Sequence, residues 1–338
     1  EAARATVRNH LNAKEEHEII FTSGTTDSIN LVSNTLALSG LIKEGDHILI
    51  SGMEHHSNIV PWQMLCERTG AELKIIPVLD NGTLDLEAYE NLLSVQTKLI
   101  ALNHVSNALG TVNPIKDMIS AAKTVNALSL IDGAQSAPHM PVDVQDLGCD
   151  FYTFSGHKTY GPTGIGVLYG TESILEDLPP WRGGGEMIKE VTFEKTTYND
   201  LPFKFEAGTP DIEGAIALAR AIDYMNEIGM DAISAHESRL EKAANSALAE
   251  IPGIQFFGNA TEKAAVISFL VEGIHHYDLG TLMDQMGVAV RTGHHCCQPL
   301  MARYGITGTV RASFAAYNTM DDIERLATSV RKASMMLG

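Results

Sequence analysis

Long hydrophobic runs are missing from this sequence. Its 338 residues contain no uncharged apolar stretch of about 18 residues, the length that a membrane-spanning helix needs. Basic runs are missing too, and the net charge of −18 argues against a nucleic-acid-binding surface. We therefore expect no membrane segment and no nucleic-acid partner.

Cysteine is also scarce. The four cysteines, Cys66, Cys149, Cys296 and Cys297, are too few for a disulfide framework in a chain of this length. Adjacent cysteines such as Cys296 and Cys297 rarely pair with each other, because the bridge is strained. No spacing matches a zinc site. We expect no metal, and a reducing, cytoplasmic setting.

An initiating methionine, a helix cap and a signal-peptide pattern are absent from residues 1–8, which resemble the middle of a helix. We expect either that an N-terminal piece has been removed or that the sequence starts inside a longer protein. Internal repeats and low-complexity segments are absent as well.

Short apolar strand patterns alternate with amphipathic helix patterns over the first two-thirds of the chain. Alternation of this kind is typical of an α/β fold with a mainly parallel sheet covered on both faces. The strand patterns lie at 18–21, 47–50, 73–77, 99–102, 128–132, 151–154 and 165–169.

After Gly183 to Gly185 the pattern changes to long helices mixed with a few strands. A helical stretch covers about 212–250, and strands at 265–269 and 309–313 alternate with helices at 277–286 and 320–336. We predict a large domain at 1–225 and a smaller C-terminal α+β domain at 226–338.

Lys158 is the most distinctive residue of the chain. An aromatic strand pattern at 151–154 leads into Ser155-Gly156-His157-Lys158 and then into a glycine-rich loop. Lysines are usually solvated. A lysine placed among aromatics and glycines is a candidate for a lowered pKa and a covalent role, such as a Schiff base.

Two other strand ends carry residues that suit a phosphorylated cofactor. Gly24-Thr25-Thr26 opens a helix and offers N–H groups and hydroxyls to a phosphate, although helix capping explains the same residues. Asp132 ends a buried strand, where a carboxylate needs a partner such as a protonated ring nitrogen. An Asx turn or an N-cap is the alternative for Asp132.

The pair His55-His56 follows another strand end and suggests metal ligands. However, neighbouring positions point apart and no third ligand of suitable spacing is near. An imidazole that stacks on a planar cofactor ring is the better functional interpretation, and capping by Ser57 or Asn58 is compatible with it. Ligands of open α/β sheets bind where strands end, so these groups are expected to converge.

Seven dispersed motifs resemble one family, the cysteine desulfurases of the SufS/CsdA type. These belong to the class V aminotransferases, which are pyridoxal phosphate (PLP) enzymes of fold type I. The motifs are Phe21-Thr22-Ser23-Gly24-Thr25-Thr26, residues 53–63, His104-Val105-Ser106-Asn107, Asp132-Gly133-Ala134-Gln135, Ser155-Gly156-His157-Lys158 with 160–164, residues 205–210, and residues 291–296.

The resemblance implies PLP as the cofactor and assigns catalytic roles to three residues. Lys158 would form the Schiff base and act as the base, His55 would stack on the ring, and Cys296 would accept the sulfur. The other implied cofactor contacts are Asp132 with the ring nitrogen, Gln135 with the phenolic oxygen, Thr25, Thr26, Ser155 and His157 with the phosphate, and Thr209 with the phosphate of the neighbouring subunit. The implied substrate contacts are Asn107, Arg311, Arg291 and His294.

The implied reaction converts L-cysteine to L-alanine and leaves the sulfur on the enzyme as a persulfide for iron–sulfur cluster assembly. The implied assembly is a homodimer. The short segment between Cys296 and the strand at Thr309 resembles the SufS branch, which hands sulfur to an acceptor protein of the SufE/SufU type.

The chain departs from the family in two places. Family members carry several dozen further residues ahead of position 1, at the entrance to the active site. Cys297 stands where a small or polar residue is more common, so it is either a bystander or a competitor for sulfur.

Three rival functions remain open at this point. The nearest is selenocysteine lyase, which would use the same residues on a carbon–selenium bond. Another class V enzyme, such as a kynureninase-like hydrolase or an aminotransferase, would not need Cys296. A PLP-less homologue that acts only as a binding partner is the third, and the intact Lys158 argues against it.

Overall fold

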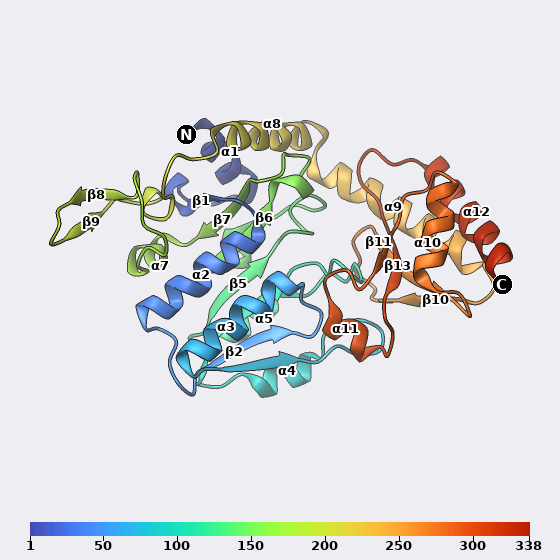
Figure 1. The fold of residues 1–338 in the computed structure, drawn as a ribbon, viewed down its shortest axis with the longest axis horizontal. Coiled ribbons are helices and arrows are strands. Elements are labelled where there is room, and N and C mark those ends of the chain that lie inside the picture. The colour runs from blue at the N-terminus through green and yellow to red at the C-terminus, as the bar shows by residue number, and fades with distance from the viewer.

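The framework of the protein is a pair of sheets, seen here in a computed structural model that describes residues 1–338 (Figure 1). The larger sheet has seven strands in the order β1-β7-β6-β5-β4-β2-β3, and the smaller has four in the order β10-β11-β13-β12. Their bounds are β1 Ile19–Thr22, β2 His47–Ser51, β3 Glu72–Ile76, β4 Thr97–Asn103, β5 Leu128–Asp132, β6 Phe151–Ser155, β7 Gly166–Gly170, β10 Ile254–Phe257, β11 Val266–Val271, β12 Arg291–Gly293 and β13 Thr309–Ser313.

Helices connect most of these strands. They are α1 Ala2–Leu11, α2 Thr25–Ser39, α3 Val60–Thr69, α4 Leu86–Leu92, α5 Ile115–Lys123, α6 Val144–Leu147, α7 Glu172–Asp177, α8 Ile212–Ile228, α9 Met230–Ala249, α10 His276–Gln285, α11 Gln298–Arg303 and α12 Met320–Leu337. A separate hairpin of β8 (Ile188–Val191) and β9 (Thr196–Tyr198) projects from the large sheet (Figure 1).

The large sheet is mainly parallel, which confirms the predicted fold class. Strands β3, β2, β4, β5 and β6 run in parallel, and β7 alone runs antiparallel to its neighbours β6 and β1. Parallel neighbours have their carboxyl ends at the same edge. The loops that follow β2, β4, β5 and β6 therefore lie together.

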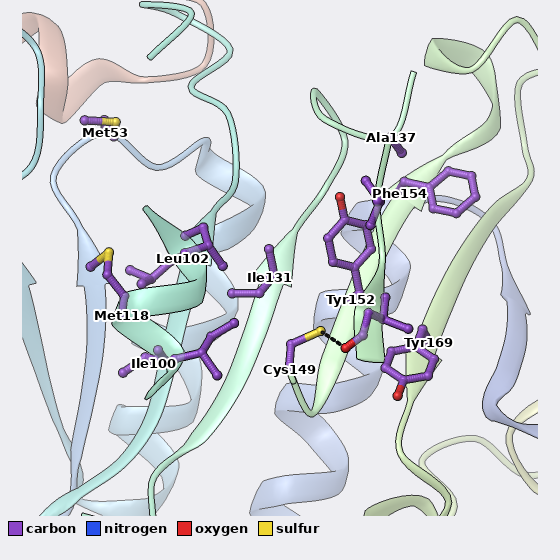
Figure 2. Close-up of a cluster of buried hydrophobic side chains, with 14 of the residues drawn as sticks. Met53, Ile100, Leu102, Met118, Ile131, Ala137, Cys149, Tyr152, Phe154 and Tyr169 are labelled. Carbon is purple, nitrogen blue, oxygen red and sulfur yellow. Dashed lines mark hydrogen bonds between the residues drawn. The ribbon is translucent and has the colours of Figure 1, made fainter. Parts of the chain in front are cut away.

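Alternate residues of the central strands pack against opposite faces of the large sheet. Ile100 and Leu102 of β4 belong to one core with α5 and α8, whereas Leu99 and Ala101 belong to a second core with α2 and α3. Figure 2 shows part of the first core, with side chains of β4, β5 and β6 and with Met118 of α5 beside Ile100 and Leu102 of β4. Burial on both faces explains the near-continuous apolar strands.

The C-terminal sheet has its own core, formed with α9, α10 and α12. The predicted domain boundary after residue 225 lies within α8, which continues to Ile228, and Gly229 separates α8 from α9. The division into two domains stays a prediction. None of the helices is long and apolar enough to cross a membrane.

Candidate active site

Three parallel strands, β4, β5 and β6, deliver their last residues to one cavity of about 220 Å³ at the carboxyl edge of the large sheet, and the loop after β2 adds His55 and Ser57. The C-terminal sheet closes one side with two arginines. The cavity is lined by Thr25, Thr26, His55, Ser57, Asn103, Val105, Asn107, Asp132, Ala134, Gln135, Ser155, His157, Lys158, Arg291 and Arg311.

Every predicted site residue except three lines this cavity. His294 and Cys296 lie next to it, in the loop after β12, where Arg291 Nη2 is 3.6 Å from Cys296 Sγ. Thr209 is exposed and lies in the segment before α8, outside the cavity lining. The predicted contact of Thr209 with a neighbouring subunit stays a prediction.

The N-terminus of α2 forms one end of the cavity. The Thr25 N–H donates to Ser155 Oγ at 2.9 Å, and the Ser155 hydroxyl donates to Thr25 Oγ1 at 2.9 Å. Gly166 permits this approach, because a Cβ there would stand 2.4 Å from Gly24 Cα. Free N–H groups and hydroxyls at a helix N-terminus form an anion site.

Asp132 lines the cavity at the end of β5. Its Oδ1 accepts the Ala134 N–H at 2.9 Å, and burial raises the pKa of the carboxyl group, against the opposing effects of Lys158 and of that N–H. Gly133 leaves room for Tyr152, whose ring atoms would lie 2.2 Å from a Cβ at that position. The remaining Asp132 oxygen is available to a cationic donor.

The Lys158 amine extends from the 3₁₀ turn Gly156–Lys158 that follows β6. Burial lowers the pKa of this amine most strongly, and Arg311 and Arg291 lower it further, whereas Asp132 opposes both. A lowered pKa makes a larger fraction of the amine neutral, as a nucleophile or a base requires.

His55 is held in one orientation by Ser57. The Ser57 N–H donates to His55 Nδ1 at 3.1 Å, and the Ser57 hydroxyl is 2.8 Å from the same nitrogen. Burial and the nearby Lys158 lower the pKa of His55 to about 4, so the ring is neutral at physiological pH. The sequence suggested Ser57 or Asn58 as the cap, but the capping acceptor of this turn is His55 itself.

Arg311 provides unused donors next to the cavity. Its Nη1 donates to the Asn107 carbonyl at 2.7 Å, whereas its buried Nε has no partner. Burial and the neighbouring Arg291 lower the pKa of Arg311 to about 10. Two adjacent guanidinium groups in a half-enclosed site favour a bound carboxylate.

Asn107 connects the cavity with the loop 294–297. Its Nδ2 donates to the His295 carbonyl at 2.7 Å, and its Oδ1 accepts from Cys297 Sγ at 3.1 Å. Both ends of the amide are therefore engaged by the loop. The predicted contact of Asn107 with a substrate carboxylate stays a prediction.

The two adjacent cysteines differ in their surroundings. Cys296 is partly exposed, whereas Cys297 is fully buried. Burial raises the pKa of Cys297 to about 12, so its thiol is protonated at neutral pH. These surroundings favour the bystander interpretation of Cys297 over competition for sulfur.

Glu54 is a buried residue to which the sequence assigned no role. Its carboxyl group accepts the Asn103 N–H at 3.0 Å and the Asn58 amide at 2.7 Å, and it also bonds the Ser51 hydroxyl. Burial raises the pKa of Glu54 to about 8, against the effect of these donors. The only sequence signal for Glu54 is its position between a strand end and the pair His55-His56. This position does not identify the hydrogen-bond partners of the carboxyl group.

The family model described as aminotransferase class-V matches residues 1–326. The chain belongs to the class V aminotransferase family. This membership confirms the resemblance of the dispersed motifs.

Several class V relatives are similar over the whole chain. The sequence is 50% identical to a protein named "Probable cysteine desulfurase" from Xylella fastidiosa strain Temecula1, over all of this chain and 81% of that protein. It is 49% identical to a cysteine desulfurase from Salmonella agona, of which it spans 83%.

The solved structures agree with these relatives. The cysteine desulfurase CsdA from Escherichia coli superposes with a TM-score of 0.96 at 40% identity, covering all of this chain and 84% of that one. A cysteine desulfurase from Thermococcus onnurineus has a TM-score of 0.95 at 39% identity, covering 99% of this chain and 84% of that one.

The residues of the cavity fit PLP, the cofactor that the resemblance implies. The Asp132 oxygen without a hydrogen bond suits a protonated ring nitrogen, and the free amine of Lys158 suits the aldehyde. Thr25 at the start of α2 and Ser155 at the end of β6 suit the phosphate. The buried donors and acceptors present match the groups that this cofactor carries.

Proposed function

We propose that this protein is a PLP-dependent cysteine desulfurase that converts L-cysteine to L-alanine and keeps the sulfur as a persulfide on Cys296. One observation carries the proposal: a partly exposed cysteine adjoins a cavity that holds a half-buried lysine opposite a buried aspartate. Lysine and aspartate suit the cofactor, and the cysteine decides between desulfuration and the other reactions of the family.

Substrate binding is assigned to the arginines. Arg311, with its unpartnered Nε, and Arg291 hold the carboxylate of L-cysteine at the side of the cavity that faces the C-terminal sheet. When bound, PLP supplies an electron sink that stabilises negative charge at the substrate Cα. Asp132 would hold the ring nitrogen in its protonated form, because a buried carboxylate favours a cationic partner.

Proton transfer is assigned to Lys158. Its Nζ takes the proton from the substrate Cα, and its lowered pKa increases the neutral fraction of the amine. His55, a neutral imidazole oriented by Ser57, would stack on the cofactor ring.

Sulfur transfer is assigned to the Cys296 thiolate. It attacks the substrate sulfur and forms an S–S bond as the C–S bond breaks. The electron pair of the C–S bond stays with the carbon, which takes up a proton and leaves as L-alanine. Arg291 Nη2, 3.6 Å from Cys296 Sγ, places a positive charge beside the attacking sulfur.

Assembly and partners are part of the same proposal. A homodimer in which Thr209 contacts the neighbouring subunit is supported by the exposure of Thr209 outside its own cavity. A sulfur acceptor of the SufE/SufU type is supported by the short segment between Cys296 and β13. A cytoplasmic location is supported by four free thiols.

The test is production of L-alanine from L-cysteine by the PLP-loaded protein, with and without a persulfide acceptor. We expect alanine in both cases and faster turnover with the acceptor. Equal rates would contradict the acceptor assignment alone. A much higher rate with L-selenocysteine would favour selenocysteine lyase, and full activity of a Cys296→Ala variant would point to another class V reaction.

A further inference from the structure

The dipeptide His55-His56 points its two rings at different targets. The ring of His55 lines the cofactor cavity, whereas His56 does not. The ring centroids are 6.2 Å apart and the planes are tilted by 47°. Because His55 and His56 are adjacent in the chain, they link the cofactor cavity to the residues that His56 contacts.

His56 contacts the loop that carries Cys296, and it does so on both sides of Cys297. The backbone N–H of His56 donates to the Cys296 carbonyl at 2.8 Å, and its Nε2 accepts the Gln298 N–H at 3.1 Å. Its ring also lies 5.6 Å from that of His294, whose Nδ1 accepts the Cys296 N–H at 3.1 Å. Because the Nε2 of His56 accepts the Gln298 N–H, this nitrogen carries no proton in this arrangement.

The loop needs such support because its backbone is strained. His295 and Cys296 have φ angles of 52° and 57°, and neither is a glycine. A left-handed conformation at a non-glycine residue persists only where the surroundings enforce it. The support comes from the edge of the large sheet, whereas the loop itself connects β12 of the C-terminal sheet with α11.

We propose that His56 is a positioning residue that holds the Cys296 thiol at the mouth of the cofactor cavity through its Nε2 contact with Gln298. This inference rests on the proposed role of Cys296. Displacement of a reacting group by about 1 Å costs on the order of a hundredfold in rate. A side-chain contact one residue beyond Cys297 is well placed to prevent such a displacement.

The direct test is amide hydrogen exchange of the PLP-loaded protein at residues 294–298. In His56→Ala, we expect the Gln298 amide to exchange roughly fivefold faster, since one hydrogen bond has been removed. His56→Gln keeps an acceptor at the Nε2 position and should restore slow exchange. His56→Asn carries its acceptor nearer the backbone, at the Nδ1 position, and should not.

The second readout is the rate of Cys296 persulfide formation in a single turnover of L-cysteine. We expect His56→Ala and His56→Asn to be roughly tenfold slower, His56→Gln to be near wild type, and the cofactor absorbance to stay unchanged in all three. His17→Ala is the matched control, since His17 pairs with Glu172 at 3.0 Å outside the site. It should change neither readout.

Equal exchange and equal rates in His56→Ala and wild type would overturn the inference, as would rescue by Asn to the same extent as by Gln. Loss of cofactor absorbance in His56→Ala would also overturn it, because His56 would then act on the cofactor site. An inactive wild-type protein would contradict the proposed function instead, and the exchange data would still decide whether His56 holds the loop.

Discussion

The carboxyl group of Glu54 accepts the backbone N–H of Asn103 at 3.0 Å, and the Glu54 side chain is fully buried. This bond joins the loop after β2, which carries His55 and His56, to the end of β4. Together with the Asn58 contact at 2.7 Å, it fixes the turn from which both histidines project.

The first prediction concerns the pH dependence of stability. Burial raises the pKa of Glu54 to about 8 from an unfolded value of 4.5, so the folded state binds the proton more tightly. The contribution of Glu54 to the free energy of unfolding is therefore fully present below its unfolded pKa of 4.5. It is lost as the pH rises from there to about 8. The slope is at most about 1.4 kcal/mol per pH unit.

We expect Glu54→Gln to flatten the pH dependence of the urea midpoint between about pH 5 and pH 8, because the titrating group is gone. Glu87→Gln, which removes an exposed carboxylate of α4, is the control and should leave the wild-type curve unchanged. A wild-type curve that rises over this interval, with Glu54→Gln removing the rise, would show that Glu54 has a lowered pKa.

The second prediction concerns the contact between β7 and α2. A Cβ at Gly166 would stand 2.4 Å from Gly24 Cα, so Gly166→Ala must displace the start of α2. We expect destabilisation of about 3 kcal/mol and weaker retention of PLP, measured by thermal unfolding and by cofactor absorbance after dialysis. Gly183→Ala, where a Cβ meets nothing within 4 Å, is the control. Full stability of Gly166→Ala would refute the close approach.

The third prediction concerns Arg311 and the substrate carboxylate. Arg311→Lys keeps the charge but loses the two-pronged donor geometry, so KM for L-cysteine should rise roughly tenfold while kcat changes little. Steady-state alanine formation measures both. Arg239→Lys on the exposed side of α9 should leave KM unchanged. A fall in kcat alone would show that Arg311 does not bind the ground-state substrate.

The fourth prediction concerns Cys297. Its thiol is fully buried, and its pKa of about 12 keeps it protonated at neutral pH. We expect iodoacetamide to label Cys296 in the folded protein and to leave Cys297 unlabelled, and Cys297→Ala to retain activity within about threefold. Mass spectrometry of the labelled peptide decides the first point. Labelling of Cys297 at the same rate would restore the possibility that it competes for sulfur.

Much of this site could be predicted from the sequence, because its parts follow strand ends. Asp132 and Ser155 end apolar strands, and the periodicity that predicts those strands also places both residues at one edge of a parallel sheet. The family resemblance then supplied a role for each residue. The β8–β9 hairpin was not predicted, since its short and exposed strands carry no apolar pattern.

The contacts that hold the cysteine loop could not be predicted. His56 and Gln298 are 242 residues apart, and nothing in the local sequence of either residue identifies the other. The left-handed conformations of His295 and Cys296 could not be predicted from the sequence either, because neither residue type requires them. Glu54 is a partial case, because two of its hydrogen-bond donors, Ser51 and Asn58, lie within four residues of it, whereas Asn103 comes from the end of β4, 49 residues away.

The central claim is that Cys296 receives the sulfur of L-cysteine. The most direct measurement is peptide mass spectrometry of the PLP-loaded protein after a single turnover without reductant, with alanine measured in the same sample. We predict a mass increase of one sulfur atom on Cys296, one alanine per site, and the loss of persulfide and turnover in Cys296→Ala. Alanine formed at the wild-type rate by Cys296→Ala, or sulfur found on Cys297 instead, would contradict the account.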